Sequence, residues 1–331
     1  MQKTDLISGR VVAVKPHELL VARGAKLLKR FQEGAGLELW HTLPVSWWQQ
    51  LAMQVPFAAR ALRLGVHHVV EAQGKTVIVA NKASYLIDEG GITSLGELQG
   101  SRPMALCAAE GQVYYGEYRS NPERSAVHVF GLDVERKVWT PVWSFQGVRH
   151  VHGVFYDPYA QAFWVTTGDS NEESAIWRTD DEFSSLKKVV GGSQQVRAVQ
   201  LLFTEDHVYF GSDAPDEPNH IYRMDRGGAK VERLCPVGGS VFYGCKVGNH
   251  LVFSTAVEPS DVNTGKEAEV WHSSEGEHWN RLLCFPKDRL SMKYFQYGQV
   301  LFPQVSEGAG NTLYCTPFAV KGHGKTLEIP L

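Results

Sequence analysis

The chain has 331 residues, of which 43% are hydrophobic and 21% are charged, a composition that is ordinary for folded proteins and excludes extensive disorder. Its 33 basic and 36 acidic side chains give a net charge of −3, so the basic excess typical of nucleic-acid-binding proteins is absent. No apolar run reaches the ~18 residues that a membrane-spanning helix requires, and no charged-then-apolar signal peptide is visible. The five cysteines are scattered and form no CxxC pair, which favours reduced thiols. We therefore expect a soluble, cytoplasmic protein.

Short apolar strands that end on a small residue recur along the chain at intervals of roughly 40–50 residues. A small residue at the end of a strand lets a neighbouring strand or turn approach closely. The series consists of 20–22, 77–80, 113–116, 163–168, 208–211, 251–254 and 300–303.

Each of these strands lies in a repeat that holds three more strands. One precedes it, as at 66–70 and 151–154, and two follow it, as at 176–180 and 188–190. Four short strands in a repeat of this length are typical of a β-propeller blade, which buries both faces only when neighbouring blades stack.

The sequence therefore predicts an all-β fold, a seven-bladed β-propeller of four-stranded antiparallel blades, as a single domain over 1–331. A strand at 325–329 is expected to complete the ring near the N-terminus. Because the first two intervals are uneven, six blades after an irregular N-terminal segment is the alternative.

Residues 46–55 predict a short helix, with Ser46 before its first turn and Pro56 at its end. Trp47, Trp48 and Leu51 share one face of this helix. We interpret it as an insertion between the first two blades whose apolar face covers the core. Docking on a membrane surface is the alternative.

The turn at 273–279, SSEGEHW, resembles the Asp-box of sialidase-like propellers, Ser/Thr-x-Asp-x-Gly-x-x-Trp, which lies between the third and fourth strands of a blade. It is one residue shorter and has Glu275 where the pattern has Asp. The turn at 179–186 keeps the Thr and Asp but not the Gly and Trp. The chain is thus similar to sialidase-like, Asp-box (BNR-type) propellers, and this resemblance implies architecture. The Arg-Ile-Pro motif of true sialidases is absent, so sialidase activity is not implied.

The central stretch RHVHGVFYDPY at 149–159, continued by WVTTGD at 164–169, resembles uncharacterised bacterial propellers of that class. Those propellers often accompany surface-polysaccharide genes. The resemblance implies a function in carbohydrate metabolism.

Polar residues in the expected inner strands would converge on the propeller axis, where ligands usually bind. Cations and phenols there suit a carboxylated sugar, because arginine binds a carboxylate through two hydrogen bonds. We predict His152 as the catalytic base, Tyr243 as the alternative proton carrier and His150 as the third catalytic residue. The predicted substrate-binding residues are His68, Arg149, Arg197, Lys293 and Tyr294 in inner strands, with Glu117, Arg119 and Asp169 at the rim.

His150 and His152 have a spacing that suits metal binding, but no companion carboxylate or third histidine follows at a fixed spacing. We therefore predict no metal and no other cofactor, and histidines held by neighbouring strands are the structural alternative. Glu117 and Asp169 follow equivalent strands. They are interpreted as loop-capping carboxylates or, alternatively, as a carboxylate pair for glycoside hydrolysis.

These observations predict a protein that binds or acts on an acidic, uronate-type oligosaccharide or polysaccharide in bacterial surface-polysaccharide metabolism. We favour an enzyme, either a polysaccharide lyase or a glycoside hydrolase. In a lyase, arginine or lysine neutralises the uronate carboxylate while histidine or tyrosine removes the adjacent proton. The alternative is a non-catalytic propeller that scaffolds polysaccharide-assembly enzymes or senses a glycan.

Overall fold

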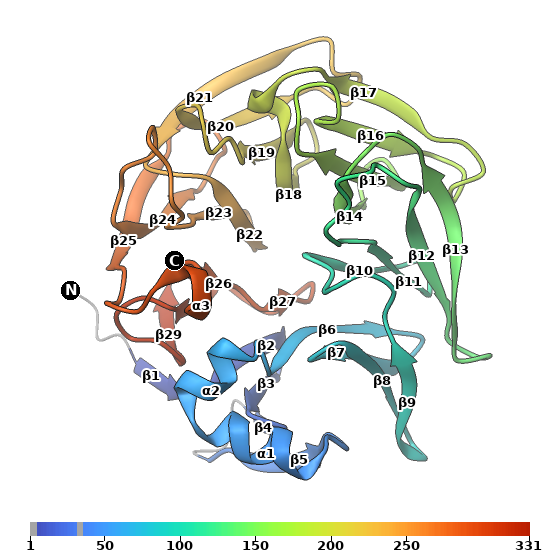
Figure 1. The fold of residues 1–331 in the computed structure, drawn as a ribbon, viewed down its shortest axis with the longest axis vertical. Helices are drawn as coiled ribbons and strands as arrows, with labels where there is room; N and C mark the ends of the chain where they lie inside the picture. The colour runs from blue at the N-terminus through green and yellow to red at the C-terminus, as the bar shows by residue number, and fades with distance from the viewer. Residues whose placement is uncertain (1–4, 32–35) are drawn as a thin grey trace.

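The computed structural model describes residues 5–31 and 36–331, and within them the chain forms a seven-bladed β-propeller (Figure 1). The blades surround a central axis, and each is an antiparallel sheet with four principal strands. This confirms the predicted seven blades over the six-bladed alternative. Residues 1–4, part of the segment in which no signal peptide is visible, lie outside the described residues.

The strands of a blade follow one another from the axis outward, and the outermost strand of the last blade comes from the start of the chain. The innermost strands are β2 (Arg10–Lys15), β6 (Val66–Ala72), β10 (Leu106–Ala109), β14 (His150–Asp157), β18 (Ala198–Phe203), β22 (Val241–Val247) and β26 (Gln299–Leu301). The second strands are β3 (Glu18–Arg23), β7 (Lys75–Ala80), β11 (Gln112–Gly116), β15 (Ala162–Gly168), β19 (Val208–Ser212), β23 (His250–Thr255) and β28 (Thr312–Phe318). The third strands are β4 (Lys26–Phe31), β8 (Ala83–Asp88), β12 (Val127–Asp133), β16 (Ala175–Thr179), β20 (Asn219–Met224), β24 (Glu267–Ser273) and β29 (Lys325–Pro330). The outermost strands are β5 (Glu38–Thr42), β9 (Gly91–Glu97), β13 (Val138–Phe145), β17 (Lys187–Gly191), β21 (Val231–Val237), β25 (Asn280–Pro286) and β1 (Asp5–Ser8).

Both ends of the chain close the ring. Strand β1 pairs antiparallel with β29, as the strand predicted at 325–329 requires. The buried hydroxyl of Thr326 accepts from the Val11 amide at 3.0 Å and donates to the Gly9 carbonyl at 2.8 Å. A short strand, β27 (Gln304–Val305), also crosses to the first blade and pairs parallel with β2.

Small residues at the ends of second strands allow adjacent blades to pack closely, as predicted. A Cβ atom on Gly116 would lie 2.2 Å from Val151 Cγ1, and one on Gly211 would lie 2.4 Å from the Val241 side chain. Both valines are buried in the apolar layers between blades. Glycine is therefore required at these two positions by the approach of the next blade.

A β-bulge recurs near the start of four inner strands. The register with the second strand shifts there, and one residue is left unpaired in each strand. These residues are Val12, His67, His152 and Phe242. A bulge redirects side chains and often lies beside a functional site. His67 and His152 thus occupy equivalent positions in the second and fourth blades.

The last blade differs from the sequence prediction. Residues 300–303 were predicted as a second strand, but they contain most of the short inner strand β26, which ends before Pro303. The second strand of this blade is β28. The expected inner-strand placement of Lys293 and Tyr294 is therefore wrong. Both lie in the short helix α3 (Met292–Phe295), where Tyr294 is exposed.

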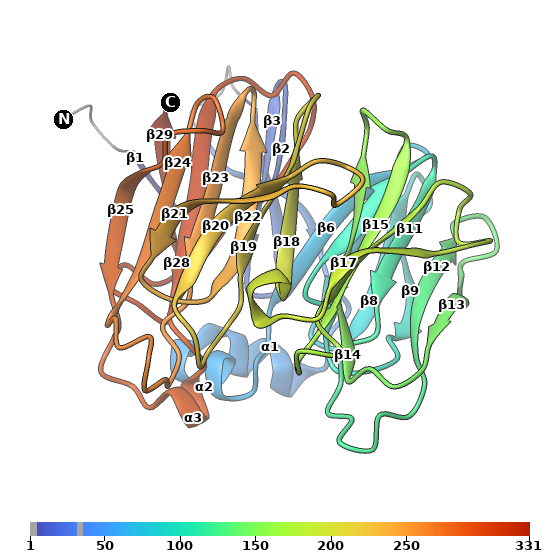
Figure 2. The ribbon, with the colours of Figure 1, turned by 90° about the horizontal axis from the view of Figure 1, so that it is seen from above.

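The predicted helix near 46–55 is α1 (Trp47–Gln54), and a second helix, α2 (Pro56–Ala61), follows directly. Figure 2 shows α1, α2 and α3 on the same side of the ring. The expectation that Trp47, Trp48 and Leu51 cover the core is wrong, since their exposed fractions are 74%, 46% and 55%. A shared helical face identifies the apolar stripe but not the body against which it packs.

The buried Arg60 joins the helical layer to the last blades. Its guanidinium forms an ion pair with Asp288 at 2.5 Å and donates to the Phe295 carbonyl. Gln296 donates in turn to the Arg60 carbonyl. Among residues 5–31 and 36–331, no helix has the length and apolarity needed to cross a membrane.

Candidate functional site

The propeller axis contains two pockets that meet in its middle. One has a volume of about 530 Å³ and opens beside the helices; we call it the helix-side pocket. The other, the far-side pocket, has a volume of about 570 Å³. The residues that line both are Arg10, His67, His68, Met104, Tyr243 and Leu301.

The helix-side pocket is lined by many cations, and none of its described lining residues is Asp or Glu. Two of the cations are satisfied by neighbours, because Arg60 pairs with Asp288 and Arg23 donates to the Ser8 carbonyl. In the described part of the chain, Arg10, Arg63 and Arg102 have no carboxylate within ion-pair distance. The six cationic lining residues are Arg10, Arg23, Arg60, Arg63, Arg102 and Lys325.

Backbone carbonyls hold Arg10 across the boundary between the first two blades. Its Nη1 donates to the Val66 carbonyl at 2.9 Å, and its Nη2 donates to the His67 carbonyl at 3.0 Å. The Nε atoms of Arg10 and Arg102 are buried without a partner in the described structure. Burial lowers the pKa of Arg10 to about 10, although Tyr243 opposes the shift. Burial and then the charge of Arg63 lower the pKa of Arg102.

Two neutral histidines lie beside these arginines. Burial lowers the pKa of His68 to about 4, and the charge of Arg10 adds to this effect. Burial followed by the charge of Arg102 places the pKa of His67 well below its usual value. His68 Nε2 lies 2.9 Å from the Pro103 carbonyl, which can only accept. In neutral His68, Nε2 therefore carries the proton and Nδ1 has a free lone pair.

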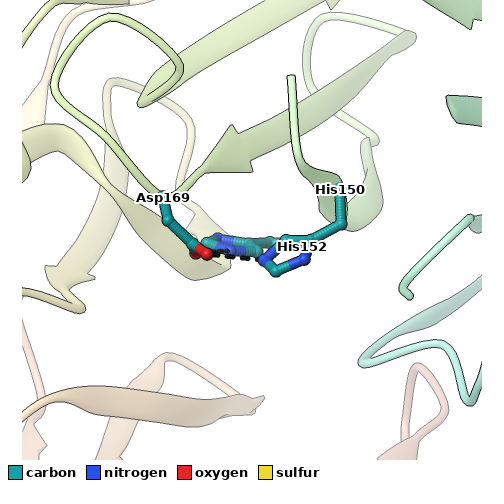
Figure 3. Close-up of side chains that lie close together, drawn as sticks. All are labelled: His150, His152 and Asp169. Carbon is teal, nitrogen blue, oxygen red and sulfur yellow. Dashed lines mark hydrogen bonds and ion pairs between the residues drawn. The ribbon is translucent and has the colours of Figure 1, made fainter. Parts of the chain in front are cut away.

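A second group, which we call the His–Asp cluster, consists of Arg149, His150, His152, Asp169 and Arg197. Figure 3 shows the two imidazoles beside the Asp169 carboxylate. Asp169 Oδ1 lies 3.0 Å from His150 Nε2, 3.6 Å from His152 Nε2 and 3.1 Å from Arg197 Nη2. Arg149 Nη1 donates to Asp169 Oδ2 at 3.0 Å.

The pairing of β14 with β15 produces this cluster. His150 is opposite Gly168, so Asp169 directly follows the partner residue. The bulge leaves His152 unpaired, and the imidazoles of His150 and His152 lie 5.0 Å apart between ring centroids. The buried carboxylate of Glu173 accepts from the amides of both Arg149 and Asp169, which fixes the two backbone segments.

The cluster is electrostatically coupled. Burial lowers the pKa of His152 to about 4, although its hydrogen bond to the Asp169 carboxylate opposes this shift. Burial alone would raise the pKa of Asp169, but the hydrogen bonds with both histidines and the charge of Arg197 hold it far below its usual value. Arg197 also forms an ion pair with the buried Asp213 at 3.1 Å. Burial raises the pKa of Asp213 to about 7 despite that pair.

The structure brings together some of the predicted site residues but not others. His68 and Tyr243 line both axial pockets, whereas Arg149, His150, His152, Asp169 and Arg197 line neither. The remaining four residues lie elsewhere in the fold: Glu117 and Arg119 in the third blade, and Lys293 and Tyr294 in α3.

Glu117 belongs to a separate network in the third blade. Its carboxylate accepts from Arg119 Nε at 2.8 Å and from the His128 amide at 3.1 Å. Arg119 reaches the His–Asp cluster only through its carbonyl, 3.4 Å from His150 Nδ1. Glu117 and Asp169 are therefore held by different sets of side chains.

Sequence reasoning did not select the arginines of the helix-side pocket. Arg10 opens the first inner strand, and Arg63 and Arg102 lie in connections between blades. Their signal in the sequence is weak, because surface arginines in loops are common. Arg10 starts an inner strand, as His150 does, and this position could have identified Arg10 as a candidate site residue.

Asp169 is the carboxylate beside His150 and His152. The spacing of residues along the sequence did not identify it. One donor atom from each of these three residues lies within 4.8 Å of the other two. No other group of three metal-ligating residues at this separation occurs in the described ranges. The fold thus supplies a third candidate ligand that does not follow from fixed spacing along the sequence.

Comparisons with known proteins define the fold class. The sequence matches no known protein family and no curated protein, so the Asp-box resemblance stays a prediction. An oligogalacturonate lyase in complex with manganese has a TM-score of 0.62 and 10% identity, over 99% of this chain and 89% of that one. The oligogalacturonate lyase of Vibrio parahaemolyticus has a TM-score of 0.61 and 9% identity, over 98% of this chain and 90% of that one. A chain of the mitotic checkpoint complex has a TM-score of 0.58 and 11% identity, over 100% of this chain and 94% of that one. At such identities the likeness shows the propeller fold alone.

Proposed function

We propose that the protein binds an acidic, uronate-type oligosaccharide in the helix-side pocket and cleaves it by β-elimination. The observation that carries this proposal is the convergence of Arg10, Arg63 and Arg102 on one pocket without a carboxylate partner. Arg63 is exposed, but the Nε atoms of Arg10 and Arg102 are buried, and buried cationic groups are costly unless an anion satisfies them. A uronate carboxylate is a suitable anion, because guanidinium groups bind carboxylates with matched geometry.

The pocket also contains groups that suit the reaction. The arginines neutralise the uronate carboxylate and stabilise the negative charge that develops when the adjacent proton is removed. His68 Nδ1 takes that proton, and its electron pair forms the carbon–carbon double bond as the bond to the glycosidic oxygen breaks. Burial raises the pKa of Tyr243, so its hydroxyl is protonated and donates to the leaving oxygen.

This assignment changes the base from His152, which lies outside both axial pockets, to His68. Structural neighbours that are named oligogalacturonate lyases support a uronate substrate, although their sequences are only 9–10% identical to this chain. The central stretch resembles bacterial propellers that often accompany surface-polysaccharide genes, and this resemblance supports a role in surface-polysaccharide metabolism. Neutral His68 between cations is consistent with a base that resists protonation near neutral pH.

The test is a lyase assay with oligogalacturonates, followed by the ultraviolet absorbance of the unsaturated product. We expect turnover by the wild type and at least a 100-fold loss of rate in His68→Gln and in Arg102→Gln. Arg136→Gln is the matched control, because the Arg136 side chain is 84% exposed and remote from the pocket lining.

The possible outcomes separate the alternatives. Binding of the oligogalacturonate without an absorbance change would replace the lyase with a non-catalytic, glycan-sensing propeller. Neither binding nor turnover would contradict the proposal as a whole. Equal losses of rate in the control and the pocket variants would show that the effects do not arise in this pocket.

A further inference from the structure

We propose that His150, His152 and Asp169 bind a divalent transition-metal ion through Nε2 of each imidazole and one carboxylate oxygen. The proposal concerns residues outside the helix-side pocket and does not rest on the proposed function. Imidazole nitrogen with carboxylate oxygen is a donor set that Zn²⁺ and related ions accept, whereas Ca²⁺ and Mg²⁺ prefer oxygen alone.

The distances between the donor atoms suit one shared ion. Bonds of about 2.0–2.1 Å in tetrahedral geometry place neighbouring donors about 3.3–3.4 Å apart. The separations from Asp169 Oδ1 are 3.0 Å to His150 Nε2 and 3.6 Å to His152 Nε2. All three donor atoms lie within 4.8 Å of one another, so side-chain adjustment can bring them around a common ion. Figure 3 shows the three side chains side by side.

The other ring nitrogen of each histidine faces a backbone carbonyl. His152 Nδ1 lies 3.0 Å from the Ala198 carbonyl, and His150 Nδ1 lies 3.4 Å from that of Arg119. A carbonyl only accepts, so Nδ1 donates to it. When an ion is bound, Nε2 carries no proton, and the bond to the ion replaces the contact between Nε2 and Asp169 Oδ1. This outer contact is the usual support of a metal-binding histidine, because it fixes both the tautomer and the ring orientation.

Two neighbouring residues pack against the imidazole rings of the donors. A Cβ atom on Gly168 would lie 2.6 Å from His152 Cε1, so glycine makes room for that ring. The Tyr118 ring lies 4.1 Å from the His150 ring and covers one side. Three protein donors leave at least one coordination position for water or a ligand.

The two arginines are compatible with an ion at this position. Arg149 contacts Asp169 Oδ2, the oxygen that the proposed coordination does not use. Arg197 contacts Oδ1 but also has Asp213 as a partner, at 3.1 Å. It can therefore release Oδ1 to the ion and still keep a carboxylate beside its charge.

Titration of the metal-free full chain with Zn²⁺ alone tests the proposal. We expect one tightly bound ion per chain, and at least tenfold weaker binding in His150→Gln and in Asp169→Asn. His250→Gln is the control, because His250 Nδ1 lies 2.9 Å from His272 Nε2 in a histidine pair without a carboxylate. We expect this variant to bind like the wild type.

Co²⁺ provides a second readout that does not depend on affinity alone. We expect visible absorption bands of a nitrogen- and oxygen-ligated ion in the wild type, altered in His150→Gln, and unchanged in His250→Gln. Circular dichroism in the presence of a chelator establishes whether each variant is folded. If His150→Gln is not folded, Asp169→Asn takes its place in the comparison with the wild type. Absence of stoichiometric binding, or equal weakening in the control, would overturn the proposal.

Discussion

Buried arginines normally contact carboxylates, and most arginines of this protein that are withdrawn from solvent do so. Arg60 has Asp288, and Arg197 has Asp169 and Asp213. Arg10 and Arg102 differ, because only backbone carbonyls or no described partner face their nitrogens. The proposed function assigns Arg10 and Arg102 to ligand binding on the basis of this difference.

The pH dependence of stability tests the environment of His68. Its pKa is about 4 in the folded chain and 6.5 without perturbation, so the unfolded chain binds the extra proton between these values. Stability is therefore present above pH 6.5 and is lost as the pH falls toward 4, by on the order of 3 kcal/mol for this residue. We expect His68→Gln to make the decline shallower in urea unfolding at a series of pH values.

The control for this experiment is the exposed His17. His17→Gln is expected to leave the decline between pH 6.5 and 4 unchanged. If His68→Gln and the wild type lose stability in parallel over this range, folding does not lower the pKa of His68, and the buried, neutral environment assigned to it is contradicted.

At the level of single residues, the sequence predicted some of the residues that lie together but not their position relative to the axial pockets. The histidines at 150 and 152 were recognised from their spacing, and the cluster with Asp169 contains them. Their exclusion from the axial pockets could not be predicted, because a bulge at His152 redirects side chains and leaves no pattern in the sequence.

Among the secondary-structure elements, the pair β14 and β15 is the one on which the His–Asp cluster depends. Its register brings Asp169 beside His150, and its bulge brings His152 to the same place. The small residue at the end of β15 has a specific role here, since Gly168 contacts the His152 ring.

Gly168→Ala tests this role. The added methyl group would lie 2.6 Å from His152 Cε1, and His152 is only 1% exposed, so the ring cannot move into solvent. We expect about 1–3 kcal/mol of destabilisation from overpacking and weaker Zn²⁺ binding. Thermal unfolding and metal titration measure the two effects. The control is Gly36→Ala, because a Cβ atom on Gly36 would meet no atom within 4 Å. Gly147→Ala is unsuitable, because Gly147 has a positive φ that alanine rarely adopts.

An unchanged melting temperature and Zn²⁺ affinity in Gly168→Ala would contradict the close packing of His152 against β15. Destabilisation of the same size in Gly36→Ala would show that the loss of a glycine, and not the contact with His152, is responsible.

The strands themselves were largely predictable, and the last blade shows the limit. In the other six blades, an apolar inner strand is followed directly by the second strand with which it pairs, and the pattern identifies both. In the last blade the inner strand β26 has three residues and the chain then crosses to β2 through β27. Its short apolar run resembles a second strand, so Lys293 and Tyr294 were assigned to a strand that is absent there.

For the whole molecule, seven repeats of four strands were sufficient to predict the propeller, since repeat length and strand number define its blades. The connection between the chain ends followed from the terminal apolar strand. The ring also creates the two axial pockets, which no single repeat contains. Arg10, Arg63 and Arg102 come from separate segments of the chain, and only closure of the ring places them on one pocket.

The measurement that tests the central claim most directly is calorimetric binding of an oligogalacturonate and of a neutral galactose oligomer of equal length. We predict that only the acidic oligomer binds, that added salt weakens its binding, and that the Arg63→Gln/Arg102→Gln double variant loses at least tenfold in affinity while Arg136→Gln does not. Equal binding of both oligomers, or full affinity in the double variant, would contradict the assignment of the helix-side pocket to a uronate.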